Sequence, residues 1–149
     1  MVKKWILDIL KDLEFVGILK IKGDQVELRK DFPIVLIQCV ENYLQELYRN
    51  YVSGKITKQA ILNKLRRTTC ENLLLEAFDI CLMDMINYRR AMLGIRDFTF
   101  TTKYLEKLYK VKKGILDTVL EQEPKLYDKI IKTISILKEY YLNLIKSFT

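Results

Sequence analysis

Histidine is absent from this chain of 149 residues. Its absence removes the commonest general base and the commonest metal ligand of proteins. The sequence also lacks a glycine-rich phosphate loop and a clustered acid–base pair. A nucleophilic cysteine would need a neighbouring base to activate it. We therefore predict a protein that is not an enzyme, with no catalytic residue, no metal ion and no cofactor.

Cysteine is scarce as well. Cys39, Cys70 and Cys81 lie far apart in the sequence and form no Cys-x-x-Cys pair. All three fall at apolar positions of predicted helices. This pattern indicates small buried side chains, unpaired, in a reducing compartment.

Glycine and proline occur only five times and twice, which disfavours a β-sandwich or barrel and favours helices. The length suits one domain, or one domain with a small appendage. Half of the residues are hydrophobic, so the chain can build a sizeable core.

Long uncharged apolar runs are missing, and the sequence therefore predicts no membrane-spanning helix. The apolar N-terminus is interrupted by Asp8, Lys11 and Asp12, and no small-residue cleavage site follows. We expect a soluble cytoplasmic protein. The net charge of +7 is too small to name nucleic acid as a partner by itself, although it is compatible with weak DNA contact.

The segment from Cys70 to Leu93 is apolar almost all the way round. Only a narrow stripe of polar side chains interrupts it, at Asn72, Glu76, Asp79, Asn87 and Arg90. A helix with so wide an apolar surface must be covered on several sides. We expect a central core helix, a subunit interface, or both. The candidate interface residues are Leu74, Phe78, Leu82 and Met85.

Periodicity and turn residues divide the whole chain into helices and one hairpin. The expected helices cover about 3–14, 31–52, 57–67, 69–93, 102–120 and 124–147, and the hairpin turns at 22–25. Asp31 is placed to cap the second helix, and Gly114 is expected to disturb the fifth. We predict an all-α fold, a helical bundle with a long central helix and a small N-terminal β-hairpin. Residues 1–30 form the helix and hairpin, and residues 31–149 form the helical bundle domain.

The charged side chains suggest two further hypotheses, a nucleic-acid-binding surface and an acid–base site. Arg66, Arg67, Lys103, Lys107 and Lys110 could form a basic surface, with Tyr104 and Tyr109 interleaved, that holds nucleic acid. The carboxylates of Asp79 and Asp84 are five positions apart and do not share a helix face, which argues against acid–base catalysis. We expect Asp79 to pair with an Arg or Lys at the edge of an interface.

Three segments resemble subunits of GINS, the replication complex that joins the MCM helicase. Val26–Phe32 is similar to the family's lead-in to its long second helix. A helix bearing Leu73, Leu74, Phe78 and Met85 leads to Arg89, near the arginine that ends the family's central helix. Leu120–Tyr127 resembles the acidic break and Leu-Tyr that open the last major helix.

The resemblance covers about residues 25–147 and is greatest to the archaeal subunit type whose helical domain comes first. It departs at Pro33, where an aromatic residue is common, and at Met92 and Leu93, where the family has a lysine. The family's small β domain after the helices has no counterpart. The resemblance implies a non-catalytic structural subunit, part of a hetero- or homo-oligomer, that bridges replication-fork proteins at the nucleoid. Its implied partners are a second GINS subunit type, the MCM helicase and a RecJ-like protein.

The N-terminal helix and hairpin leave an alternative open. The helix-then-hairpin start, which ends in residues 16–28, resembles the last helix and wing of a winged-helix module. The chain would then be a small DNA-binding regulator, cellular or viral. Lys20, Lys22, Arg29 and Lys30 would contact phosphate.

Overall fold

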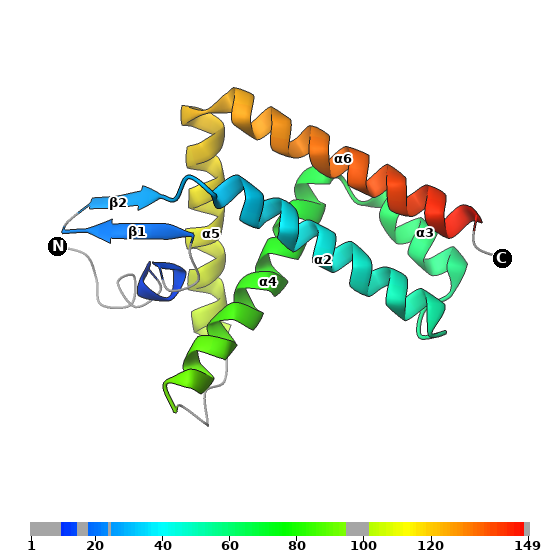
Figure 1. The fold of residues 1–149 in the computed structure, drawn as a ribbon, viewed down its shortest axis with the longest axis horizontal. Helices are drawn as coiled ribbons and strands as arrows, with labels where there is room; N and C mark the ends of the chain where they lie inside the picture. Colours follow the sequence, from blue (N-terminus) through cyan, green and yellow to red (C-terminus); the bar gives the residue numbers. More distant parts are fainter. Residues whose placement is uncertain (1–9, 15–17, 24, 95–101, 148–149) are drawn as a thin grey trace.

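The computed structural model describes residues 10–14, 18–23, 25–94 and 102–147. It confirms the predicted all-α bundle with a long central helix and a small N-terminal hairpin (Figure 1). Residues 10–14 are the described part of the predicted first helix, and they are helical. The elements that follow are β1 (Leu19–Lys22), β2 (Gln25–Leu28), α2 (Phe32–Val52), α3 (Lys58–Arg67), α4 (Cys70–Met92), α5 (Thr102–Gln122) and α6 (Pro124–Ser147).

The central helix of the bundle is α4. It contacts α2, α5 and α6, whereas α2 and α6 also pack against each other (Figure 1). Helix α3 lies under the C-terminal half of α6 and joins α2 to α4. With other helices on several sides of α4, its wide apolar surface is explained by packing within the chain.

One hydrophobic core runs through the described part of the molecule. It takes in Leu13, Ile18 and Leu19 from the N-terminal segment together with Phe32 of α2 and Ile145 of α6. The hairpin and the bundle therefore share buried surface. A hydrogen bond strengthens this connection, because the Glu14 carboxylate accepts the Ile21 N–H at 2.6 Å.

The hairpin pairs β1 and β2 antiparallel, with Leu19 opposite Leu28 and Ile21 opposite Val26. These apolar residues share one face, because residues directly opposite each other point the same way. Leu19 is buried in the core, whereas Val26 at the tip is exposed. Gly23 in the predicted turn has a φ of 60°, a value that glycine adopts without steric cost.

Several helix ends follow the sequence closely. The Thr57 hydroxyl accepts the Ala60 N–H at 3.1 Å and caps α3, and Thr69 does the same for Asn72 at the start of α4. Gly94 follows α4 with a φ of 76°.

Two local predictions were wrong. Asp31 precedes α2 but makes no capping hydrogen bond, since its carboxylate pairs with the Arg29 guanidinium at 3.3 Å. Gly114 does not disturb α5, which runs unbroken from Thr102 to Gln122. Helix propensity is a weak preference, and the packing of α5 against α4 and α6 outweighs it.

Candidate interaction surfaces

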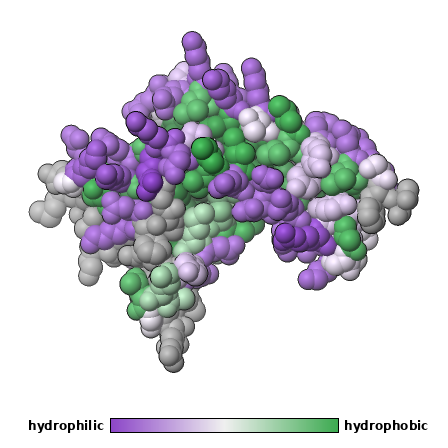
Figure 2. All heavy atoms as spheres, in the orientation of Figure 1, coloured by the Kyte–Doolittle hydropathy of each residue, from purple (hydrophilic) through white to green (hydrophobic). Residues whose placement is uncertain are grey.

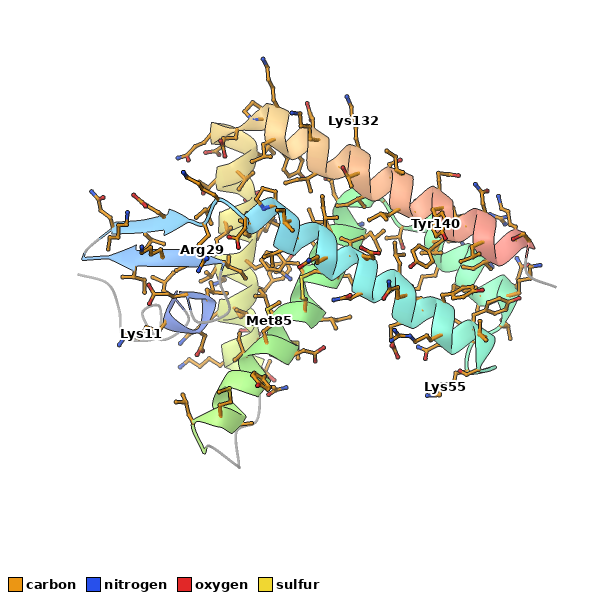
Figure 3. The ribbon with its side chains drawn as sticks, viewed as in Figure 1. Lys11, Arg29, Lys55, Met85, Lys132 and Tyr140 are labelled. Atoms are coloured by element: carbon orange, nitrogen blue, oxygen red, sulfur yellow. A yellow bond between two sulfur atoms is a disulfide. The ribbon has the colours of Figure 1, made fainter. Side chains whose placement is uncertain are left out.

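The predicted interface on α4 is largely core. Leu74, Phe78 and Leu82 are 1%, 0% and 1% exposed in the single chain, so they contact its own helices and not a partner. The Phe78 ring packs edge-on against the Phe32 ring of α2, with centroids 6.1 Å apart. Met85 is half-buried and faces a groove beside α2 (Figure 3). Within this chain the three buried side chains are therefore core residues.

Apart from Ile80, which is 45% exposed beside the groove, the large exposed apolar side chains of α4 lie at its C-terminal end. Tyr88, Met92 and Leu93 are 66%, 64% and 60% exposed. This end projects from the bundle beyond α2 and α6 (Figure 1), and Figure 2 shows apolar atoms near it. The sequence did carry a signal, because Tyr88 and Met92 are one helical turn apart just before Gly94.

A groove of about 670 Å³ lies between α2 and α4. One wall carries a polar network in which the Tyr43 hydroxyl donates to the Glu76 carboxylate at 2.7 Å. The Lys64 ammonium, from α3, pairs with the same carboxylate oxygen at 3.2 Å. It also lies 5.6 Å from the centroid of the Tyr43 ring. The three residues join α2, α3 and α4.

The network shifts two ionisation equilibria. Burial raises the pKa of the Tyr43 hydroxyl, and the neighbouring Glu76 carboxylate raises it further. The pKa of Lys64 is also raised, first by its interaction with Tyr43 and then by Glu76. Both shifts extend the pH range of the protonated network further into alkaline conditions.

The groove contains a disulfide bond between Cys39 of α2 and Cys81 of α4. The expectation of three unpaired cysteines is wrong for these two. Their Cα atoms are 5.7 Å apart, within the range that a disulfide spans, although 42 positions separate them in the sequence. Spacing along the chain could not reveal the pair, since only the crossing of α2 and α4 brings them together. Cys70 is free and half-buried.

Asp79 pairs with a lysine, as predicted, but inside the chain. The Lys112 ammonium of α5 lies 3.1 Å from the Asp79 carboxylate and 3.3 Å from the Leu75 carbonyl oxygen. Lys112 is only 2% exposed, and its ammonium is 4.8 Å from the Tyr109 ring centroid. The pair therefore fixes α5 against α4. Asp84 lines the groove between α2 and α4 and takes no part in the Asp79–Lys112 pair.

The predicted basic surface is not one surface. Arg66 and Arg67 end α3, next to the start of α4, whereas Lys103, Lys107 and Lys110 lie in the first half of α5. Figure 1 shows these two places at opposite ends of α4, which is about 35 Å long at 1.5 Å per residue. The side chains of Tyr104, Arg89 and Arg90 lie outside what the structure describes.

The basic residues of the hairpin have acidic neighbours. Lys22 pairs with Glu27 at 3.2 Å, and Arg29 pairs with Asp31 at 3.3 Å. Lys20 stands opposite Glu27 in the β-ladder. These carboxylates offset much of the positive charge that a phosphate-binding wing would present.

Within the described ranges, no three cysteine or carboxylate side chains are grouped so that they could hold a metal ion. None of the helices in that part of the chain combines the length and apolar character needed to cross a membrane. Comparisons with protein-family models, with curated proteins and with solved structures find no match to this chain.

Proposed function

We propose that the protein is a non-catalytic helical scaffold that binds another protein through the projecting end of α4. The observation that carries the proposal is the exposure of Tyr88, Met92 and Leu93 on this end. Large apolar side chains gathered at one exposed place mark interaction sites in many soluble proteins. Aromatic residues and methionine are also enriched at the centres of protein interfaces.

The complex that we propose for this scaffold is GINS, with the chain bridging the MCM helicase, a second GINS subunit type and a RecJ-like protein. Two features of the fold support it. A long central helix is covered by other helices, and the acidic break at Glu123–Pro124 separates α5 from α6 where the resemblance expects a new helix. This role would place the protein at the nucleoid.

The experiment compares two pairs of charged substitutions in the full chain. The test variant carries Tyr88→Asp and Met92→Asp. The control carries Ile136→Asp and Tyr140→Asp on the outer face of α6, where these side chains are 70% and 60% exposed at the same spacing. Light scattering reports the mass in solution, and a nuclease-treated pull-down read by mass spectrometry identifies the partners.

We expect the wild type and the α6 control to keep the same mass and partners, and the α4 variant to lose them. Equal behaviour of all three proteins would exclude the α4 end as the interface. Recovery of MCM and a second helical subunit with the wild type supports the GINS assignment, and their absence removes it.

The winged-helix alternative makes a different prediction. Replacement of Lys20, Lys22 and Arg29 by Glu should abolish salt-dependent duplex binding by the chain alone. The ion pairs of Lys22 and Arg29 with carboxylates weigh against this alternative.

A further inference from the structure

The two cysteines of the disulfide differ in exposure, although both line the groove. Cys39 is 2% exposed and belongs to the buried face of α2. Cys81 is half-buried, on the side of α4 that faces the groove. A thiolate that enters the groove therefore reaches the Cys81 sulfur more easily than the Cys39 sulfur. Access decides which sulfur of a disulfide is attacked.

We propose that Cys81 is a thiol–disulfide exchange site, where a small thiol compound reversibly opens the bond between α2 and α4. The inference does not depend on the proposed scaffold function, because it rests on the groove and the disulfide alone. The reaction partner is a low-molecular-weight thiol, and the reverse reaction uses the disulfide form of the same compound.

The exchange takes place in two balanced steps. The thiolate attacks the Cys81 Sγ and forms a mixed disulfide, while the Sγ–Sγ bond breaks and Cys39 leaves as a thiolate that takes up a proton. A second thiolate then attacks the compound's sulfur in the mixed disulfide. It releases the oxidised compound and leaves Cys81 as a thiolate, which is protonated in turn. Two thiol molecules are oxidised to one disulfide, and one protein disulfide is reduced to two thiols.

Cys70 cannot take the place of the external thiol. It lies eleven residues before Cys81 on the same helix, a separation of about 16 Å along the axis. Direct sulfur–sulfur contact is impossible at that distance unless α4 unfolds. The opened form therefore keeps Cys39 and Cys81 as each other's partners, so that closing restores the original bond.

The charges around the groove should make a cationic thiol react faster than an anionic one. Glu76 is paired with Lys64, and Glu46 is paired with Arg49 at 3.3 Å. Asp84, one helical turn after Cys81, is exposed and joins no ion pair within the described residues. Its carboxylate repels an anionic thiol and attracts a cationic one. At a separation of about 6 Å in water, Coulomb's law gives each effect a size of roughly threefold in rate.

The first experiment locates the attacked sulfur. Variants Cys39→Ser and Cys81→Ser, each with Cys70→Ser, are treated with cystamine, and intact mass follows the gain of one mixed disulfide. We expect Cys81 to react at least about tenfold faster than Cys39, as its access predicts. Equal rates, or faster reaction of Cys39, would overturn the proposal.

A second measurement on the wild-type chain covers the case in which a variant fails to fold. The oxidised protein is exposed briefly to cysteamine and quenched with acid, and peptide mass spectrometry locates the mixed disulfide. Modification at Cys81 supports the proposal, and modification at Cys39 contradicts it. Three free thiols after equilibration with cystamine would also overturn it, because no bond would then exist to open.

The charge preference is tested with cysteamine, which is cationic, and mercaptoethanesulfonate, which is anionic, at low salt. We expect cysteamine to reduce the wild-type bond several-fold faster, and Asp84→Asn to remove most of this difference. Asp128→Asn, an exposed carboxylate on α6, is the matched control and should leave it unchanged. Loss of the preference in both variants, or in neither, would contradict the assigned role of Asp84.

Discussion

The two halves of α4 have similar apolar composition and opposite surroundings. From Leu73 to Leu82 most apolar side chains are buried among α2, α5 and α6, and Ile80, which is 45% exposed, is the exception among the large ones. From Tyr88 to Leu93 they lie on a projecting end and are mostly exposed. An apolar helix surface must be buried, but its sequence does not reveal whether other helices of the chain or a partner protein bury it. In this chain the protein's own helices cover one half, and a partner is proposed for the other.

The largest expected effect separates the two halves directly. Phe78→Ala removes a fully buried ring that packs on Phe32 and should lower the free energy of unfolding by about 3–5 kcal/mol. Met92→Ala, on the exposed end, should change it by less than about 0.5 kcal/mol. Urea denaturation of the isolated chain measures both. A similar loss in the two variants would show that the end of α4 is also buried in solution.

The second prediction concerns the bond that holds the buried half of α4 to α2. The double change Cys39→Ser with Cys81→Ser opens a constraint that spans 42 residues. Because the unfolded chain gains freedom, we expect the free energy of unfolding to fall by about 2–4 kcal/mol. Reduction of the wild type should reproduce the loss, whereas Cys70→Ser should have little effect. A wild type whose stability is indifferent to reductant would rule out this contribution.

The third prediction compares the buried and the exposed partner of one ion pair. Asp79→Ala leaves the Lys112 ammonium buried beside a single carbonyl oxygen and should cost about 2–4 kcal/mol. Lys112→Met should cost only about 1 kcal/mol, because the Asp79 side chain is 39% exposed and can be hydrated. Thermal and urea denaturation show which of the two variants loses more free energy of unfolding. The reverse order would mean that Asp79 is the more deeply buried group.

The smallest expected effect is a pH dependence of the melting temperature, caused by the Tyr43–Glu76–Lys64 network at the groove. The pKa values of Tyr43 and Lys64 are raised in the folded chain above their ordinary values of 10.0 and 10.5. Their contribution to stability is complete below those values and is lost as the pH rises through the folded pKa values. We expect the melting temperature to fall above about pH 10. Tyr43→Phe should weaken this dependence and not abolish it, because burial also raises the pKa values of Tyr127 and Tyr141. Tyr140→Phe, an exposed site, serves as the control.

Local signals in the sequence predicted most of the element boundaries. Thr57 caps α3 and Gly94 follows the end of α4, at the boundaries expected for these helices, since both effects involve only neighbouring residues. Predictions failed where a distant contact competed. In α2, for example, Ile34 is exposed while Leu36 is buried. The rotation of α2 is set by the helices against which it packs, and a sequence rich in apolar residues leaves that rotation open.

The candidate site was less predictable than the fold. Apolar character singled out the helix from Cys70 to Leu93, but it selected Leu74, Phe78 and Leu82, which the chain itself buries. No spacing rule could point to the Cys39–Cys81 bond or to the Tyr43–Glu76–Lys64 network. Each joins residues from different helices that meet only after folding.

The sequence by itself determined that this chain is helical, where its helices begin and end, and that its central helix must be covered. Those properties depend on periodicity, caps and turn residues, which act over a few positions. Only the tertiary structure decided which side chains are core, which cysteines are bonded and which end of α4 is open. These outcomes depend on how the helices cross, and the crossing is set by the combined packing of side chains far apart in the sequence.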